Sequence, residues 1–436
     1  MEQNNSNVQE LQNRLLQRSA RIAVIGLGYA GLPLLCNIAL AGFSTVGVDK
    51  DKNRVHLLED NISPFPDVSN DLLHQIEDRT SFTDSYAVIQ QCDVSIICVP
   101  TPLKDQYPDL STVIDVAQSL KNVLSERHLV VLESTTYPGT TEEILRPILE
   151  TPPFSVGENL FLAYSPERID PGNTVFSLKN TPKLVSGVTP SCTLLVQILY
   201  NTFVNDVVVV SSPAVAEAAK VLENTYRFVN IALVNEFAIF CNELNLNVWD
   251  VIAAAATKPY GFAAFRPGSG VGGHCIPIDP NYLSWKARQH GTPLHLVEVA
   301  RDTNERMPDF VVHRISDILN RTGQALSTAR VLVLGVTYKP GVPDIRESSS
   351  VHVIRKLVRK GVQVSYHDPF ISSLQIDNDY LQCVDQLHEE LENADLVVVA
   401  TNHPQYDWEI VKASARYIFD TCGVYRSCVS SKIFLL

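Results

Sequence analysis

The segment from Ala20 to Asp51, ARIAVIGLGYAGLPLLCNIALAGFSTVGVDKD, constrains the fold of this chain more than any other. An apolar, β-rich run leads into glycines, then into a stretch with helical periodicity, and a second apolar run follows that ends in an acid. This order is typical of a βαβ unit in a doubly wound parallel sheet. We therefore predict an α/β protein with a Rossmann-like domain at its start.

The glycines of this unit have the GxGxxG spacing of a dinucleotide-binding turn, and an acid follows eighteen residues after the last of them. Glycines there permit a tight turn and a close approach of a pyrophosphate to a helix N-terminus. The acid accepts hydrogen bonds from a ribose 2′-OH, which favours NAD over NADP. The alternative for the glycines is a plain structural turn, and the alternative for Arg54 is a solvated surface position. The predicted contacts are Gly26, Gly28, Tyr29, Ala30, Gly31, Asp49 and Arg54.

Length and composition exclude several classes of protein. At 436 residues we expect two or three domains, and 45% hydrophobic with 19% charged residues is typical of a soluble globular protein. A polar N-terminus and the lack of a long apolar run predict a cytoplasmic protein without a membrane partner. Nine scattered cysteines without CxxC or Cys/His spacing indicate neither a disulfide framework nor a metal, and a net charge of −13 argues against a nucleic-acid partner.

Three further apolar runs end in loops that carry polar residues. CDVSIICVPTP and HLVVLESTTYPG deliver Thr101, Ser134 and Thr135, and LFLAYSPERID delivers Glu167 and Arg168. Loops at the carboxyl ends of parallel strands line the ligand crevice of such a sheet, so these side chains are candidates for cofactor or substrate contacts. The alternative is that the hydroxyls cap the following helices.

A long helix is predicted from Pro213 to about Asn245. Lys220 and Asn224 lie four residues apart and so project from one face of it. A helical lysine is usually solvated, but small residues surround this one, which favours a functional role. The same helix is a candidate dimer interface.

The last third of the chain predicts a second Rossmann-type unit without the phosphate glycines. The run ARVLVLGVTYKPGVPDIRESSSVHVIRKLVRKGVQVSYHDP has the order strand, loop, helix and strand, and ADLVVVAT and RYIFDTC add further strands. Lys339 and Arg346 lie in its first loop, before three serines that open the helix. Cations and hydroxyls at a helix start suit a diphosphate; the alternative is that both are surface charges.

The stretch GSGVGGHCIPID, residues 268–279, surrounds Cys275 with glycines and places Asp279 four residues later. A free cysteine is often inert packing, but Gly272, Gly273 and His274 are not the flanks of a buried thiol. A thiolate beside an NAD site adds to an aldehyde and carries its oxidation through a thioester to an acid. His274 and Lys220 are both candidates for lowering the pKa of the thiol.

These motifs together resemble the UDP-glucose/GDP-mannose dehydrogenase family. The GxGxxG start, STTYPG, SPERIDPG, the helix with Lys220 and Asn224, GVGGHCIPIDP and YKPGVPDIRESSS occur in that family's order, from Arg21 nearly to the C-terminus. The motifs GGHCIPIDP and SPERIDPG are most similar to those of the branch that oxidises UDP-N-acetylhexosamines. Within that branch the resemblance favours UDP-N-acetylglucosamine as the substrate. His274 and the segment SPERID depart from the glucose-specific pattern, so these motifs do not define which residues contact the sugar.

The resemblance implies roles for individual residues. Cys275 is the implied covalent nucleophile, Lys220 and Asn224 stabilise the oxyanion, Asp279 is a general base through water, Glu167 assists thioester hydrolysis, and Thr135 orders water. Substrate contacts are implied for Glu167, Arg168, Lys220, Asn224, Arg266, Gly272 and Lys339, with Arg266 crossing to the diphosphate of a partner subunit. Cofactor contacts are implied for Thr101, Thr135 and Arg346.

We expect a polar extension at 1–19, an NAD-binding Rossmann domain at 20–210, a central helical dimerisation domain with the cysteine loop at 211–322, and a UDP-sugar-binding Rossmann-like domain at 323–436. The predicted reaction is the four-electron, NAD-dependent oxidation of C6 of UDP-N-acetylglucosamine to the uronic acid, for polysaccharide precursors, by a homodimer or larger homo-oligomer. Alternatives are the mannosamine or glucose substrate, a two-electron dehydrogenase with an inert cysteine, and a noncatalytic NAD-binding regulator.

Overall fold

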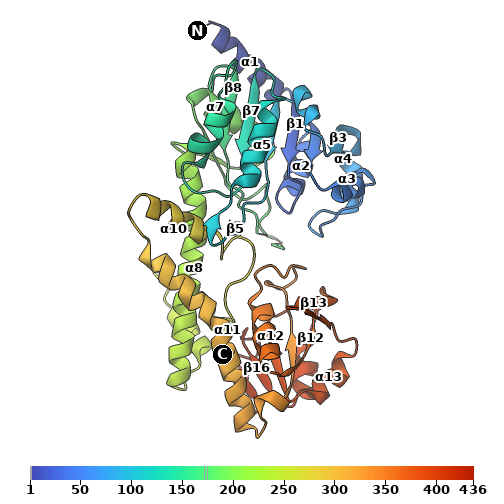
Figure 1. Cartoon of the computed structure of the whole chain (residues 1–436), viewed down its shortest axis with the longest axis vertical. Coiled ribbons are helices and arrows are strands. Elements are labelled where there is room, and N and C mark those ends of the chain that lie inside the picture. Colours follow the sequence, from blue (N-terminus) through green and yellow to red (C-terminus); the bar gives the residue numbers. More distant parts are fainter. Residues whose placement is uncertain (1, 171, 174) are drawn as a thin grey trace. The chain divides into compact units, whose positions relative to one another are not determined.

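The computed structural model describes residues 2–170, 172–173 and 175–436. The chain forms two units, Met1–Glu223 with Asn281–Gly291, and Asn224–Pro280 with Thr292–Leu436. Each contains one main sheet, coloured blue to green in the first unit and orange to red in the second (Figure 1). The predicted α/β class with two Rossmann-like sheets and a long helix between them in sequence is confirmed.

The first unit has an eight-stranded sheet of order β10-β9-β8-β7-β4-β1-β2-β3. Neighbouring strands pair in parallel except β8 and β9, which run antiparallel with Tyr164 opposite Ser186. The strands are β1 (Arg21–Ile25), β2 (Ser44–Val48), β3 (Thr80–Thr83), β4 (Val94–Ile97), β7 (His128–Leu132), β8 (Leu160–Tyr164), β9 (Lys183–Gly187) and β10 (Val207–Val209). The sequence prediction included neither β3 nor the antiparallel β9.

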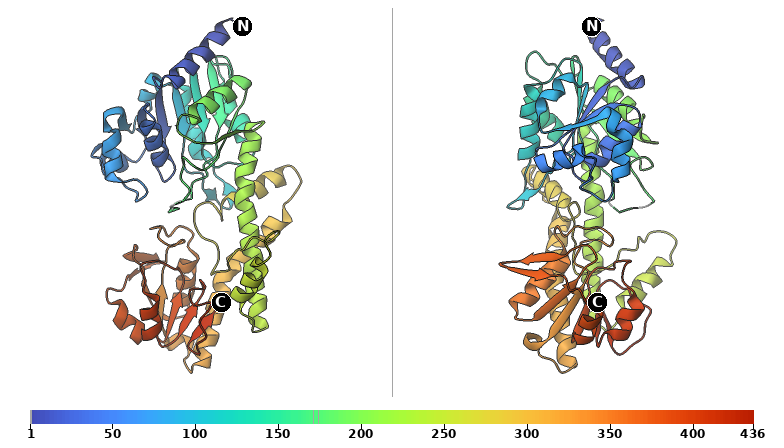
Figure 2. Two further views of the ribbon diagram at one scale, coloured as in Figure 1. Left: turned by 180° about the vertical axis from the view of Figure 1, so that it is seen from behind. Right: turned by 90° about the vertical axis from the view of Figure 1, so that its right-hand side faces the viewer.

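The central strands are mostly apolar and almost entirely buried because both faces of the sheet are covered, which is why they appear in the sequence as nearly continuous apolar runs. All five residues of β7 and of β8 are buried. Helices lie on both faces of this sheet (Figures 1 and 2), with α7 packed on β8 and β9 and α1 packed on α7. The segment predicted as a polar extension forms α1, which buries Leu11 and Leu15 in the core.

The remaining elements of the first unit are α1 (Glu2–Leu16), α2 (Gly31–Leu40), α3 (Lys52–Glu59), α4 (Asn70–Ile76), η1 (Glu77–Arg79), η2 (Tyr86–Gln91), the hairpin β5 (Leu103–Lys104) and β6 (Tyr107–Pro108), α5 (Ser111–Lys121), η3 (Thr141–Leu145), α6 (Arg146–Leu149) and α7 (Pro190–Tyr200).

The predicted long helix is α8 (Pro213–Glu243), 31 residues without a break. Figure 2 shows it as one straight yellow-green ribbon. Its first turns belong to the first unit, where the buried carboxylate of Glu217 accepts hydrogen bonds from Gly139 N (2.6 Å), Thr141 N (2.9 Å) and Thr141 Oγ1 (2.7 Å). These bonds anchor the start of the helix to the turn that follows STTYPG.

The second unit has a five-stranded sheet of order β12-β11-β15-β16-β17, parallel throughout. The predicted second Rossmann-type unit is therefore present, with β17 as a strand that the prediction did not include. Its strands are β11 (Arg330–Leu334), β12 (Gln363–His367), β15 (Leu396–Val399), β16 (Ile418–Asp420) and β17 (Ile433–Leu435), and a separate hairpin consists of β13 (Ser373–Ile376) and β14 (Asp379–Gln382).

The helices that follow α8 are α9 (Val248–Ala256), α10 (Asp279–Gln289), α11 (His295–Arg321), η4 (Leu326–Thr328), α12 (Ser349–Arg359), α13 (Leu387–Asn393) and α14 (Trp408–Ser414). In the second unit α12 packs against α11 and β12. Within the described part of the chain, no helix is both long enough and apolar enough to cross a membrane.

Candidate active site

The predicted dinucleotide turn connects β1 to α2, and two of its glycines are required by packing inside the protein. Gly26 has φ +92°, and a Cβ there would lie 2.5 Å from the Cys98 carbonyl oxygen; a Cβ on Gly31 would lie 1.9 Å from the oxygen of Gly26. A Cβ on Gly28 would meet nothing within 4 Å. The turn is therefore closed against the sheet but open at Gly28. The helix α2 begins at Gly31 without a side-chain cap, and Leu32 N donates to the Gly28 carbonyl (3.1 Å).

Asp49 follows β2 and is bonded to this turn. Its Oδ2 accepts from Leu27 N (2.8 Å) and from Arg54 Nη1 (2.8 Å), and its Oδ1 accepts from Asp51 N (2.9 Å). Arg54 lies over the ring of Phe65, which also stacks on Tyr29 at 4.3 Å between centroids. The structure thus brings the predicted Asp49, Arg54 and Tyr29 together and adds Phe65, which has no motif in the sequence to mark it.

The hydroxyl-bearing loops after β4 and β7 lie side by side because these strands pair. Thr101 Oγ1 donates to the carbonyl of Thr135 (2.8 Å), and Ser134 Oγ donates to the carbonyl of Val99 (2.8 Å). Thr136 is fully buried, and its Oγ1 has no hydrogen-bond partner among the described residues. Since a buried hydroxyl is normally satisfied, Thr136 is a second candidate for the water-ordering role beside Thr135.

Glu167 and Arg168 follow β8 at the same edge of the sheet. Glu167 accepts a short hydrogen bond from Ile169 N, and its other oxygen, Oε2, is buried with no partner within the described ranges. Arg168 binds Glu223 (3.3 Å) and the carbonyl of Pro182 (3.0 Å). A small hollow beside them is lined by Glu167, Arg168, Ile169, Leu178, Thr181, Pro182 and Lys183.

On α8, Lys220 is buried, with 7% of its surface exposed, rather than solvated. Asn224, one turn further on, is also buried. Its Nδ2 donates to Asp279 Oδ2, and its Oδ1 accepts from Arg227 Nη2; both bonds are short. The amide is therefore held with its N–H₂ group toward Asp279. Sequence reasoning missed Arg227, although its spacing of three residues from Asn224 on a helix was a signal.

The cysteine loop is fixed by its own backbone and by the start of the second Rossmann-like sheet. The Cys275 carbonyl accepts from Ile278 N (3.1 Å) and Asp279 N (2.8 Å), which sets the thiol one turn before α10. The glycines at 272 and 273 lie against the side chain of Tyr338, where an added Cβ would come within 2.9 Å and 2.8 Å of it. The bare backbone predicted here is therefore a packing requirement.

His274 is half-buried beside Cys275 in sequence. Burial lowers the pKa of His274, and the positive charge of Arg346 lowers that pKa further. Both effects favour the neutral imidazole of His274, which argues against it as a cation beside Cys275. The role of Lys220 toward the thiol stays a prediction.

Lys339 and Arg346 lie in the loop between β11 and α12. Arg346 makes a bidentate pair with Asp344 (2.6 and 2.9 Å), and its carbonyl accepts from Gly273 N (3.1 Å), so this loop and the cysteine loop are bonded to each other. Gly272 packs against Glu347 and Tyr338 in the same place. Arg266 is exposed, at the end of the exposed stretch 253–264.

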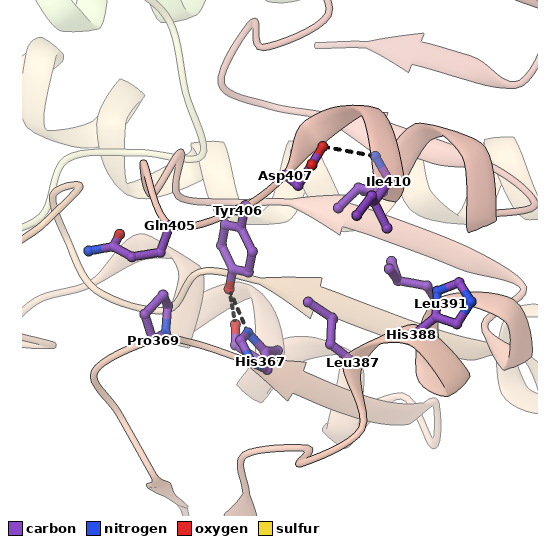
Figure 3. A pocket seen from close by; sticks show the side chains of 10 residues that line it. His367, Pro369, Leu387, His388, Leu391, Gln405, Tyr406, Asp407 and Ile410 are labelled. Carbon is purple, nitrogen blue, oxygen red and sulfur yellow. Dashed lines mark hydrogen bonds between the residues drawn. The ribbon is translucent and has the colours of Figure 1, made fainter.

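A separate hollow of about 290 Å³ lies at the carboxyl end of β12, between α13 and α14 (Figure 3). Tyr406 OH donates to the carbonyl of His367 (2.7 Å) on its wall. None of the residues predicted from the sequence lines it.

Comparison with known proteins agrees with this geometry. Residues 20–204, 214–306 and 332–427 match the NAD binding, central and UDP binding domains of the UDP-glucose/GDP-mannose dehydrogenase family. The chain is 38% identical over 368 residues to a UDP-N-acetyl-D-glucosamine 6-dehydrogenase of Pseudomonas aeruginosa, covering 83% of this chain and 86% of that protein. It is 34% identical over 392 residues to a UDP-N-acetyl-D-mannosamine dehydrogenase of Methanocaldococcus jannaschii, covering 88% and 86%. A solved UDP-D-ManNAc dehydrogenase of Pyrococcus horikoshii is similar with a TM-score of 0.84 at 31% identity, covering 95% of this chain and 98% of that one.

Proposed function

Because this chain belongs to the UDP-glucose/GDP-mannose dehydrogenase family and is an NAD-dependent UDP-sugar dehydrogenase, we propose that it oxidises C6 of UDP-N-acetylglucosamine to the carboxylate through a covalent intermediate on Cys275. The observation that carries the proposal is the cysteine loop, which sets a thiol at a helix start and bonds Asp279 to Asn224. UDP-N-acetylmannosamine is the second candidate substrate, because relatives named for it are 31–34% identical to this chain.

The cofactor site proposed here is the turn at Gly26, Gly28 and Gly31 with Asp49 and Arg54. Its fit rests on the open side of the turn at Gly28 and on the carboxylate bonded at the end of β2. Thr101 and Thr135 at the strand ends and Arg346 are the further proposed cofactor contacts. Bound NAD supplies the hydride acceptor for both oxidations.

In the proposed mechanism the first of the two oxidations converts the C6 alcohol to an aldehyde. The Cys275 thiolate then adds to the aldehyde carbon, forming a C–S bond and an alkoxide that is stabilised by hydrogen bonds from Lys220 and Asn224. Loss of hydride from this carbon leaves a thioester. Asp279 takes protons through water, and Glu167 assists the attack of water that breaks the C–S bond and releases the acid. Thr135, or the neighbouring Thr136, orders that water. Two NAD are consumed for each sugar.

The proposed substrate contacts are Arg168, Gly272 and Lys339, in addition to Glu167, Lys220 and Asn224. We further propose the division at 20–210, 211–322 and 323–436 after an N-terminal extension at 1–19. The family matches at 20–204, 214–306 and 332–427 support this division.

A homodimer through α8 is part of the proposal. Exposed apolar side chains follow one another at helical spacing along α8, at Tyr226, Leu233, Phe237 and Phe240, with Leu244 directly after the helix. A continuous apolar stripe of this kind on a long helix suits a second copy of the chain. Arg266, in an exposed stretch, would then reach the partner's substrate. Leu233→Asp should shift the protein to monomer in light scattering; an unchanged dimer would refute this interface.

The test of function is the yield of NADH with excess NAD and limiting UDP-sugar. Two NADH per UDP-N-acetylglucosamine, and a lower rate with UDP-N-acetylmannosamine and UDP-glucose, are expected. Cys275→Ser should abolish acid formation while leaving NADH binding unchanged. One NADH per sugar in the wild type, or a serine variant that forms acid at the normal rate, would refute the covalent scheme; NADH binding without turnover on any UDP-sugar would favour a noncatalytic protein.

A further inference from the structure

The first unit contains a buried ion pair to which the proposed mechanism gives no part. Lys183 Nζ lies 2.7 Å from Glu133 Oε2, and the two side chains are 2% and 1% exposed. Tyr200 OH donates a short hydrogen bond to the other oxygen of Glu133. Replacing a buried ion pair by apolar side chains of similar size is often neutral or stabilising, so folding alone does not account for the pair.

The antiparallel strand β9 explains why Lys183 lies at the proposed active-site edge. Because β9 runs opposite to β8 and its last residues pair with the last residues of β8, the beginning of β9 lies beside the segment that follows β8, where Glu167 comes two residues after Ser165. Two hydrogen bonds hold these segments together: Ser165 Oγ donates to the Leu184 carbonyl (2.8 Å), and Arg168 Nη1 donates to the Pro182 carbonyl (3.0 Å). The Glu167 loop is therefore fastened on both sides of Lys183.

The charges around Lys183 come from several elements. Glu133 follows β7, Tyr200 ends α7, Cys98 follows β4, and Glu167 follows β8. The Arg168 charge is taken up by Glu223 (3.2 Å). Burial disfavours the ammonium, but the carboxylates of Glu133 and Glu167 together raise the pKa of Lys183 above its usual value. The two carboxylates thus favour the ammonium form of Lys183.

Glu167 has a buried oxygen that such a cation would stabilise. Its Oε2 is buried in the small hollow that Lys183 also lines, and no group in the described part of the chain donates to this oxygen. A buried carboxylate oxygen that no group donates to costs free energy. A fixed cation in the same hollow offsets part of this cost.

We propose that Lys183 is a positioning residue for acyl-enzyme hydrolysis, whose ammonium, held by Glu133 and Tyr200, places a positive charge beside Glu167 and keeps its loop in place. This rests on the proposed function. In the step concerned, water oxygen bonds to the thioester carbon, the C–S bond breaks, the Cys275 thiolate leaves, and the proton lost by water passes to Glu167. No oxidation occurs in this step, so the two hydride losses that precede it do not require Lys183.

The test compares Lys183→Met, the neutral pair Lys183→Met with Glu133→Gln, the conservative Lys183→Arg, and Lys121→Met as a control on the exposed end of α5. The double variant avoids leaving Glu133 as an unpaired buried charge, so it is the variant to interpret if Lys183→Met fails to fold. For each we would measure the NADH burst in a single turnover, the steady-state rate from pH 6 to pH 10, and the mass of the chain during turnover.

We expect the double variant to keep a burst of two NADH per Cys275 while its steady-state rate at pH 7.5 falls by about tenfold to a hundredfold. The acid limb of its pH profile should change, since the positive charge beside Glu167 is lost, and the acyl-enzyme should be visible by mass. Lys183→Arg should recover most of the rate, and Lys121→Met should match the wild type.

A burst and a steady-state rate that fall together, with an unmoved pH profile, would make the pair purely structural and overturn the proposal. Failure of the proposed function would appear differently, as one NADH per sugar or no acyl-enzyme in the wild type itself.

Discussion

The two Rossmann-like sheets begin with the same device and then diverge. In the first, Gly26 has φ +92° and leaves no room for a Cβ against the Cys98 carbonyl; in the second, Gly335 has φ +82° and leaves none against the Thr401 carbonyl. After each turn a backbone N–H binds an acid at the end of the next strand, Leu27 N to Asp49 (2.8 Å) and Val336 N to Asp368 (2.7 Å). The first glycine therefore belongs to the fold rather than to the ligand.

The difference lies in the chain that follows this glycine. In the first sheet α2 begins at Gly31, close against Gly26; in the second, α12 begins only at Ser349. The longer loop removes the need for the other two glycines and makes room for Lys339 and Arg346. This explains why the second unit was correctly predicted as Rossmann-like without a phosphate signature, even though its first glycine is present.

The two acids also have different neighbours. Asp49 is bonded to Arg54, whose side chain is 29% exposed, so the pair borders solvent. Asp368 is bonded to His403 (3.1 Å), and both side chains are fully buried. His403 also contacts Thr337 Oγ1 (3.0 Å) and accepts from Gly341 N (3.2 Å), so in the second sheet the acid holds the loop that carries Lys339. The same position thus borders solvent in one sheet and is enclosed by the protein in the other.

The largest expected effect separates the glycines of the first turn. Gly31→Ala places a Cβ 1.9 Å from a backbone oxygen and should destabilise the protein by about 3 kcal/mol or more. Gly28→Ala meets nothing within 4 Å, so thermal unfolding should be unchanged, while NADH binding weakens by about tenfold, or 1.4 kcal/mol. Calorimetry measures the stability of each variant, and titration measures its NADH affinity. Gly335→Ala should destabilise the protein as Gly31→Ala does. A normal NADH affinity for Gly28→Ala would place the pyrophosphate elsewhere.

The next effect concerns a buried histidine on a strand of the first sheet. His128 begins β7 with Ser95 Oγ 2.8 Å from its Nε2, and burial lowers its pKa from 6.5 to about 4. Below pH 6.5 the unfolded chain binds a proton that the folded chain refuses until about pH 4, so stability is complete above pH 6.5 and is lost as pH falls. This difference corresponds to about 3 kcal/mol.

Urea unfolding of the first unit, followed between pH 7.5 and pH 4.5, should show this loss, and His128→Gln should flatten it. The exposed His74 provides the control, since His74→Gln should leave the slope unchanged. The same slope in His128→Gln would assign the acid sensitivity to other groups.

The smallest effect compares the two acids. Asp368→Asn removes a charge from a network of buried donors and should cost roughly 2 kcal/mol of stability and weaken UDP binding, with NADH binding unchanged. Asp49→Asn should instead reduce the preference for NADH over NADPH, with UDP binding unchanged. Calorimetric titration with UDP, NADH and NADPH distinguishes the two. If both variants lost affinity for the same ligand, the acids would not have the separate roles that their neighbours indicate.

Much of the candidate site was predictable because it depends on short-range spacing. The glycine turn with Asp49, the pair Lys220 and Asn224 on one helix, and the loop around Cys275 each lie within a single segment whose local conformation follows from glycine, from helical periodicity and from apolar runs. Such patterns are physical properties of neighbouring residues, so they are visible without a fold. The family motifs extended the same information along the chain.

The tertiary structure decided which side chains from distant segments meet. Lys183 binds Glu133 across 50 positions, and Asn224 binds Asp279 across 55. The first contact depends on β9 running antiparallel to β8, and the second fixes the Asn224 amide together with Arg227. Phe65 and the unpartnered hydroxyl of Thr136 likewise have meaning only in three dimensions. Local sequence determines the conformation of a segment, whereas the partner of a buried charge depends on strand direction and packing, which one segment alone does not contain.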